Sequence, residues 1–142
     1  MNNVISMKPI GRIETPFKTR EDLKVPPFDP RAPYHDPDVI GTVRLFEEYA
    51  QGAADIKPGA YAMLIFYFDR SQGYNLTTRS PRYEEPVGVF STRSPNRPNG
   101  IGLSIVQFLS TDGCILTFRG VDMLDGTPLL DIKPYSGEIP GG

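Results

Sequence analysis

The sequence has little of the chemistry from which many protein sites are built. Its 142 residues contain one cysteine, Cys114, and one histidine, His35. A lone cysteine excludes an intramolecular disulfide, argues against a cysteine-based metal site and is typical of a reducing compartment. A single histidine leaves no histidine pair and gives no support to a Ser-His-Asp triad. We therefore expect a protein with no disulfide and no metal.

Long apolar and targeting segments are also missing. The most apolar run, Tyr61 to Phe68, has eight residues, whereas a membrane-spanning helix needs about 20. Residues 1–9 have neither the apolar stretch of a signal peptide nor the Arg-rich pattern of a transit peptide. The sequence therefore predicts a soluble cytoplasmic protein with no membrane partner.

Charge of one sign is not in excess over the whole chain. Lys plus Arg number 15 and Asp plus Glu 17, for a net charge of −2, so any polyanion must be met locally. The window 70–97 is locally basic, because it holds five arginines against Glu84 and Glu85: Arg70, Arg79, Arg82, Arg93 and Arg97. Such a cluster is either a solvated face or a binding surface.

Short apolar segments separated by turns predict an all-β fold in one domain, residues 1–142. The expected strands cover residues 9–14, 39–46, 61–68, 86–92, 101–109, 114–121 and 129–132. The run 61–68 is continuous enough to be buried on both faces, and Asp112-Gly113 is a hairpin signal. Residues 15–38 contain six prolines and predict a long N-terminal loop, and residues 47–51 predict one or two helical turns that Gly52 ends. A barrel or a sandwich accounts for this pattern.

The stretch from Gly88 to Ser104, GVFSTRSPNRPNGIGLS, is the most unusual part of the chain. It is no dinucleotide fingerprint, because Ile105 stands where a third glycine is required and a strand follows instead of a helix. Two guanidinium groups four residues apart in a proline-stiffened segment suit a carboxylate or phosphate, and two glycines allow a ligand to approach closely. An ordinary turn is the equal alternative. The residues concerned are Arg93, Pro95, Asn96, Arg97, Pro98, Asn99, Gly100 and Gly102.

A second motif, DGTPLLDIKPY, runs from Asp125 to Tyr135. Asp125-Gly126-Thr127-Pro128 has the composition of a tight turn, whose carboxylate either accepts hydrogen bonds from a ligand or caps its own turn. Asp131, Lys133 and Tyr135 alternate as they would on one face of a strand.

Together these motifs resemble the TsaA-like family, also called TrmO, of S-adenosylmethionine-dependent tRNA methyltransferases. The resemblance rests on VGVFSTRSPNRPNGIGLSIV (87–106) and VDMLDGTPLLDIKPY (121–135), with weaker matches at IGRIETPFK (10–18) and LFEEYAQGAADI (45–56). It implies a barrel of six or seven strands with little helix and a homodimer with its cofactor site near the subunit interface. It also implies N6-methylation of threonylcarbamoyladenosine beside the tRNA anticodon.

The resemblance also implies site residues. Those expected to bind the cofactor are Arg93, Leu103, through its backbone, Asp125, Gly126, Thr127 and Pro128. Pro26, Pro27, Phe28, Asp69 and Arg70 stand at further cofactor-bordering positions, although many relatives carry Pro-Arg-Gln and histidines in these segments. Arg97, Asn99, Lys133 and Tyr135 are candidates for substrate contact, and Asp125 is a candidate base.

The differences from many relatives at Pro26, Pro27, Phe28, Asp69 and Arg70, together with the mildly acidic composition, keep other functions open. One is methylation of another RNA or of a small molecule. Another, of a different class, is a non-catalytic module that binds S-adenosylmethionine or RNA through the basic window 70–97.

Overall fold

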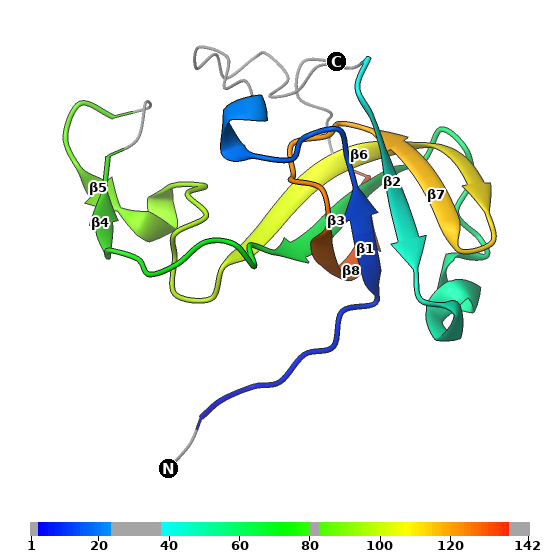
Figure 1. The fold of residues 1–142 in the computed structure, drawn as a ribbon, viewed down its shortest axis with the longest axis horizontal. Helices are drawn as coiled ribbons and strands as arrows, with labels where there is room; N and C mark the ends of the chain where they lie inside the picture. Colours follow the sequence, from blue (N-terminus) through cyan, green and yellow to red (C-terminus); the bar gives the residue numbers. More distant parts are fainter. Residues whose placement is uncertain (1–2, 24–37, 80–82, 137–142) are drawn as a thin grey trace.

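The computed structural model describes residues 3–23, 38–79 and 83–136 and contains a closed barrel of six antiparallel strands (Figure 1). The strand order around the barrel is β1-β2-β7-β6-β3-β8. The strands are β1 (Gly11–Glu14), β2 (Ile40–Leu45), β3 (Tyr61–Tyr67), β6 (Ile101–Asp112), β7 (Ile115–Arg119) and β8 (Thr127–Pro134). The all-β fold expected from the sequence pattern and the barrel of six or seven strands implied by the resemblance are confirmed.

Alternate side chains of each strand fill the barrel interior. The fully buried residues include Ile13, Leu64, Phe108, Phe118 and Leu129. Burial in β3 also alternates, because one face of a barrel strand points inward and the other outward. The expectation that 61–68 is buried on both faces is therefore wrong. Its apolar outer face is exposed in part, with Tyr61 at 36% and Tyr67 at 44%.

Four strands begin or finish at one end of the barrel, which we call the motif end. Here Ile13, near the end of β1, pairs with Thr127 at the start of β8. Tyr67, the last residue of β3, pairs with Ile101, the first of β6. The barrel order places β3 between β6 and β8. Both sequence motifs therefore enter the barrel at the same end.

Helical structure among the described residues is limited to three 3-10 segments, η1 (Arg20–Asp22), η2 (Glu47–Ala53) and η3 (Val89–Ser91). The helical turns expected at 47–51 are present, but Gly52 does not end them. The strand expected at 86–92 is wrong beyond Gly88, where η3 begins. No helix in the described part of the chain is long and apolar enough to cross a membrane. Most of the Pro-rich loop, residues 24–37, lies outside the described residues.

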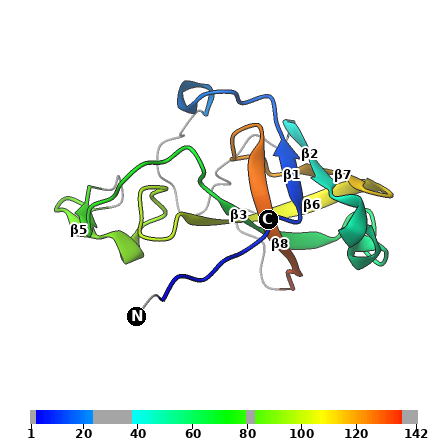
Figure 2. The same ribbon diagram turned by 60° about the horizontal axis from the view of Figure 1, so that its bottom comes forward.

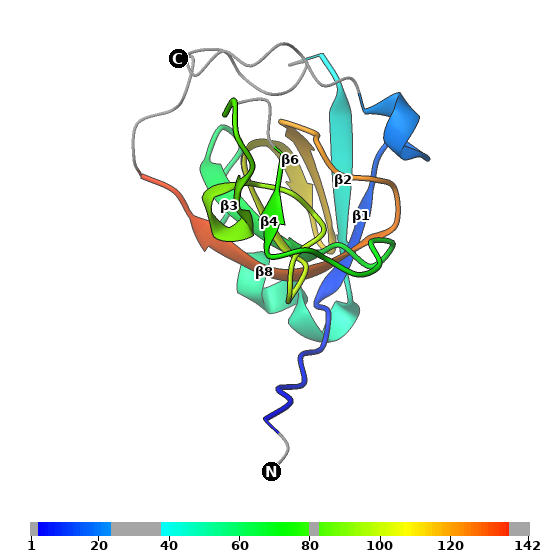
Figure 3. The same cartoon turned by 90° about the vertical axis from the view of Figure 1, so that its left-hand side faces the viewer.

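The described residues from 69 to 99 form a lobe that extends from the motif end, away from the barrel (Figures 1 and 2). In the view toward the barrel's end the lobe stands in front of it (Figure 3). The lobe contains a two-stranded sheet of β4 (Thr77–Thr78) and β5 (Val87–Gly88). It exposes four large apolar side chains: Tyr74, Leu76, Tyr83 and Phe90.

Candidate functional site

The turn Asp125-Gly126 is attached to the N-terminal part of the chain by its backbone. The N–H of Asp125 donates to the carbonyl oxygen of Phe17, and that of Gly126 donates to Ile13, each over 2.7 Å. Gly126 has φ of 84°, a conformation that glycine adopts without the cost other residues bear. Pro128 follows in β8, opposite Arg12 of β1. The tight turn expected here is present, and it is fixed to the barrel.

The carboxylate of Asp125 accepts two hydrogen bonds. Oδ1 accepts a hydrogen bond from the N–H of Thr15 at 3.0 Å, and Oδ2 accepts one from Nζ of Lys18 at 2.6 Å. The bond from Lys18, then that from Thr15, lowers the pKa of Asp125 below its ordinary value, since both favour the ionised form. The Asp125 side chain remains 30% exposed. It therefore offers a fixed negative charge that is open to solvent.

Two arginines also converge on this turn. Arg70 Nη2 donates to the carbonyl oxygen of Asp125 at 2.7 Å and lies 3.4 Å from the hydroxyl of Thr127. Arg12 Nη1 donates to the carbonyl oxygen of Gly126 at 3.1 Å. Asp69 lies beside Arg70, with 3.5 Å between Oδ1 and Nε. Of the residues expected to border the cofactor, Arg70, Asp125, Gly126 and Thr127 are thus in contact.

Arg93 and Leu103, the other expected cofactor pair, also touch. Arg93 Nη2 donates to the carbonyl oxygen of Leu103. Between β3 and β6, residue 60 faces residue 108 and residue 68 faces residue 100 in hydrogen-bonded pairs. Bonded and non-bonded pairs alternate along an antiparallel ladder, so Leu103 and its partner Ile65 form a non-bonded pair. The backbone N–H and carbonyl of Leu103 therefore point away from β3. On that side β7 pairs with β6 only from Gln107 onward. The edge of β6 at Leu103 is therefore left open by the barrel ladder.

The sequence predicted that Gly100 and Gly102 allow a ligand to approach closely, and the structure gives both glycines a role in packing or backbone geometry as well. A Cβ at Gly102 would meet the ring of Phe66 and would lie 2.7 Å from Cζ of Phe68. Gly100 has φ of 54°, and a Cβ there would lie 3.2 Å from Cε1 of Tyr67. Aromatic side chains at the end of β3 thus require both glycines.

The four residues expected to contact substrate are not gathered in one place. Arg97 Nη1 donates to the carbonyl oxygens of Thr92 at 2.9 Å and Ser94 at 3.2 Å, so it shapes its own loop. Asn99 is exposed beside Gly100.

Lys133 and Tyr135 lie away from the motif end. Lys133 pairs with Asp131 at 3.4 Å, and the N–H of Tyr135 donates to Tyr61 at the start of β3. At 3.3 Å per residue, Tyr135 is roughly 25 Å from Thr127 along β8. They therefore lie apart from the Asp125 turn, and their expected contact with substrate stays a prediction. Pro26, Pro27 and Phe28 lie outside the described residues.

The sequence interpretation gave no role to Arg12, Thr15 or Lys18. All three belong to the weaker matching segment IGRIETPFK (10–18), yet each contacts the acidic turn. Because they lie more than 100 residues from the turn, only that match signalled them.

These features define a class: an antiparallel β-barrel protein with an acidic turn, arginines and an open strand edge gathered at one end of the barrel. A family model described as "tRNA-methyltransferase O N-terminal domain" matches residues 12–139. The chain belongs to this family, and the resemblance drawn from its two motifs is confirmed.

Known proteins of similar sequence or fold match this chain over more than half of its length. A Pyrococcus abyssi protein named a probable S-adenosyl-L-methionine-binding protein is 42% identical over 96% of this chain and 71% of its own length. The crystal structure of TrmO from Pseudomonas aeruginosa has a TM-score of 0.72 and 32% identity, over 94% of this chain. A mouse tRNA (adenine(37)-N6)-methyltransferase is 43% identical over 53% of this chain and 18% of its own length. The chain spans 56% of the Pseudomonas protein's chain.

Proposed function

We propose that this chain is a methyltransferase that binds S-adenosylmethionine at the motif end. The observation that carries the proposal is the arrival of both motifs at this end, where Arg70 contacts the Asp125-Thr127 turn. The family description and the name of the Pyrococcus relative agree with this cofactor.

The residues at the motif end fit the functional groups of S-adenosylmethionine. Arg93 carries a guanidinium suited to the carboxylate of the methionine part. Asp125 carries a negative charge suited to its amine or to the ribose hydroxyls. The backbone N–H of Leu103, whose carbonyl oxygen Arg93 contacts, suits an acceptor on the edge of an adenine. A Cβ at Gly126 would meet nothing within 4 Å, so there is space beside the turn.

The chain's contribution to methyl transfer is mainly binding and orientation. S-adenosylmethionine supplies an electrophilic methyl group on a positively charged sulfur. The residues of the motif end hold donor and acceptor in line, which is the main demand of such a reaction. The lowered pKa of Asp125 makes it a weak base at neutral pH. We therefore assign Asp125 to binding and not to removal of the acceptor's proton.

The acceptor that we propose is tRNA, at N6 of threonylcarbamoyladenosine next to the anticodon. The description of the family and the name of the mouse relative support a tRNA adenine. On the lobe Arg79 is exposed and offers a positive charge to the RNA backbone, while Glu84 and Glu85 are exposed there too.

We also propose that the active protein is a homodimer, joined through the outer face of β3 and β6. Tyr67 pairs with Ile101 on this face and Ile65 with Leu103, and the side chains of Tyr67, Ile101 and Leu103 are 38–44% exposed. Contiguous exposed apolar side chains are typical of protein interfaces. Leu103 lies at the open edge as well, so this face adjoins the cofactor site. Ile101→Asp should yield a monomer in analytical ultracentrifugation.

Two measurements test the proposed activity. Calorimetric titration should show binding of S-adenosylmethionine that Arg93→Ala weakens by tenfold or more, as expected when a charged partner is lost. Mass spectrometry of tRNA nucleosides from a deletion strain should show loss of methylated threonylcarbamoyladenosine. Equal affinity in Arg93→Ala would remove the cofactor assignment, and unchanged nucleosides would remove the acceptor.

A further inference from the structure

A cavity in the lobe has no role in the site described so far. Its volume is about 360 Å³, and it is lined by Gln72, Gly73, Tyr74, Asn75, Thr78 and Asn96. Among the described lining residues three carry carboxamides, two, Tyr74 and Thr78, carry hydroxyls, and none is acidic or basic. Its chemistry is therefore neutral, although it lies in the arginine-rich lobe.

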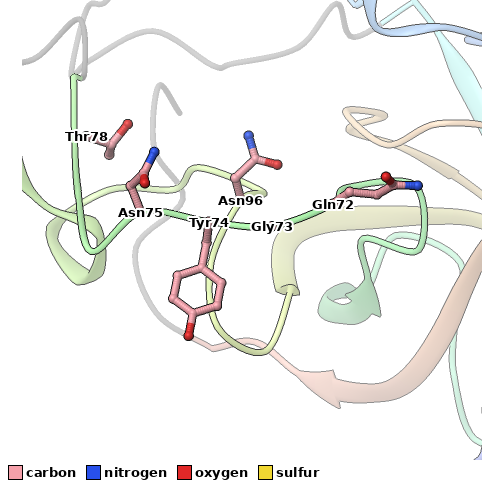
Figure 4. A pocket seen from close by; sticks show the side chains of 6 residues that line it. All are labelled: Gln72, Gly73, Tyr74, Asn75, Thr78 and Asn96. Atoms are coloured by element: carbon pink, nitrogen blue, oxygen red, sulfur yellow. The ribbon is translucent and has the colours of Figure 1, made fainter.

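The carboxamides of this cavity are available to a ligand. The side chains of Gln72, Asn75 and Asn96 form no hydrogen bond with the rest of the described protein. The carboxamides of Asn75 and Asn96 extend to the same side of the segment 72–78, and the ring of Tyr74 extends to the other (Figure 4). Each carboxamide offers two donors and two acceptor positions. The cavity thus presents several unfilled donors and acceptors together.

The walls of the cavity are held in place by other contacts. Thr78 belongs to β4, which pairs with β5. The N–H of Asn96 donates to Oγ of Ser94 at 3.2 Å. Gly73 has φ of 70°, a left-handed conformation that glycine adopts readily. The cavity is therefore built from two separate segments, each with its own restraint.

The cavity adjoins the motif end through the chain itself. Gln72 follows Arg70 by two residues, so their Cα atoms are at most about 7 Å apart. Arg70 contacts the Asp125 turn. Asn96 lies between Arg93 and Arg97 in sequence. Both walls therefore continue directly into residues of the candidate cofactor site.

We propose that this cavity binds a neutral, unpaired nucleobase of the RNA acceptor; the inference rests on the proposed RNA methylation. Carboxamides pair well with the donor and acceptor edges of bases, and specific RNA recognition targets unpaired bases in loops. A neutral base suits the cavity better than a phosphate, because no side chain among its described lining residues is cationic. Arg79 is exposed next to Thr78, and it contacts the adjoining phosphate from the rim.

The test compares two RNA probes that differ by one base. Fluorescence anisotropy is measured with a labelled single-stranded heptanucleotide carrying a central adenosine and with the same strand carrying a central abasic site. The wild-type protein should prefer the first about tenfold, and Asn96→Ala and Asn75→Ala should each reduce this preference to less than threefold. Arg79→Ala should weaken both probes equally and lower the salt dependence of binding.

Controls separate this inference from loss of fold and from the cofactor site. Gln51→Ala removes an exposed carboxamide on η2, outside the lobe, and should leave the base preference unchanged. Asn96→Asp keeps the shape of the side chain and loses the donor, and should also lose the preference. No base preference in the wild type, or an unchanged preference in both Ala variants, overturns the inference.

Titration with S-adenosylmethionine is carried out on the same variants. Wild-type affinity for it in Asn96→Ala, together with lost base preference, supports a separate base site. A protein that binds S-adenosylmethionine and methylates tRNA but shows no base preference refutes the cavity inference alone. A protein that prefers the adenosine strand but does not bind S-adenosylmethionine refutes the proposed cofactor alone.

Discussion

The acidic turn and the arginine loop, which carry the two motifs, are held in place by different kinds of contact. The carboxylate of Asp125 bonds to Thr15 and Lys18, 110 and 107 residues away. In the other segment Arg97 bonds to Thr92, five residues away, and the N–H of Asn96 bonds to Ser94, two residues away. The turn is therefore tied to the barrel by long-range contacts, whereas the loop is held largely by local ones, apart from the bond between Arg93 and Leu103 of β6.

This difference predicts two levels of stability. Opening the turn breaks contacts between β8 and β1, so it requires disruption of the barrel. Opening the lobe breaks mainly local bonds and the two-residue sheet of β4 and β5. Segments with few buried contacts open at lower free energy than the core. A fixed turn suits a small cofactor and an adaptable lobe suits a large acceptor.

The largest expected effect comes from the barrel core. Phe118→Ala removes a fully buried ring and should lower the free energy of unfolding by about 3–5 kcal/mol. Phe90→Ala, in the lobe, removes a ring that is 75% exposed and should change it by less than about 0.5 kcal/mol. Urea unfolding followed by circular dichroism measures both. A cost for Phe90→Ala above about 2 kcal/mol would mean that lobe and barrel form one unit.

The next effect concerns the link between the motifs inside the barrel. Ser104 of β6 is 4% exposed, and its Oγ donates to Oδ1 of Asp122 at 2.5 Å. Ser104→Ala takes a donor from this carboxylate and should cost about 1–3 kcal/mol. Ser110→Ala removes a hydroxyl from the same strand, where Oγ contacts Thr117 in an exposed position, and should cost less than about 0.5 kcal/mol. Equal costs in urea unfolding would contradict a special role of the buried bond.

A smaller effect on stability, but a larger one on binding, is expected for Arg70. Arg70→Ala removes the bond between the start of the lobe and the Asp125 carbonyl, which should cost about 1 kcal/mol of stability. It should also weaken binding of S-adenosylmethionine about tenfold, because one side of the turn is lost. Arg44→Ala removes a surface pair with Glu14 at 2.6 Å and serves as the control in calorimetry. Equal affinity in both variants would show that Arg70 does not support the site.

The sequence predicted the barrel well because its strands follow simple local rules. The alternation in residues 39–46 and the Asp112-Gly113 turn are local signals, and both structures formed where expected. The segment 86–92 has the residue types of a strand, but only Val87 and Gly88 find a partner, in β4. Sequence pattern alone does not reveal whether a partner strand is present.

The candidate site was predictable only in part for the same reason. Asp125 and Arg93 belong to motifs of unusual composition, so the sequence singled them out. Lys18 is an ordinary lysine until the barrel brings it 2.6 Å from Asp125. Tyr135 shares a motif with Asp125, yet the length of β8 carries it to the other end of the barrel. Residues far apart in the sequence can thus lie close together in the fold, and residues of one motif can lie far apart.

The smallest expected effect is the dependence of the acidic turn on pH. The pKa of Asp125 is lowered from 3.8 in the folded state, so the folded protein favours the ionised carboxylate. This contribution is complete above the unfolded pKa and is lost as the pH falls through the folded pKa. At pH 7 the wild type should exceed Asp125→Asn in free energy of unfolding by up to about 1 kcal/mol.

The difference in free energy of unfolding between the wild type and Asp125→Asn should stay constant down to about pH 5 and should shrink toward zero below pH 4. Asp22 also has a lowered pKa, because the N–H groups of Lys18 and Thr19 donate to it, but it is present in both proteins and its contribution cancels. Asp131→Asn, on the exposed part of β8, controls for the loss of one negative charge. A difference that grows in acid would mean that Asp125 is not stabilised in its ionised form, and the turn would then lack the fixed charge on which its proposed binding role depends.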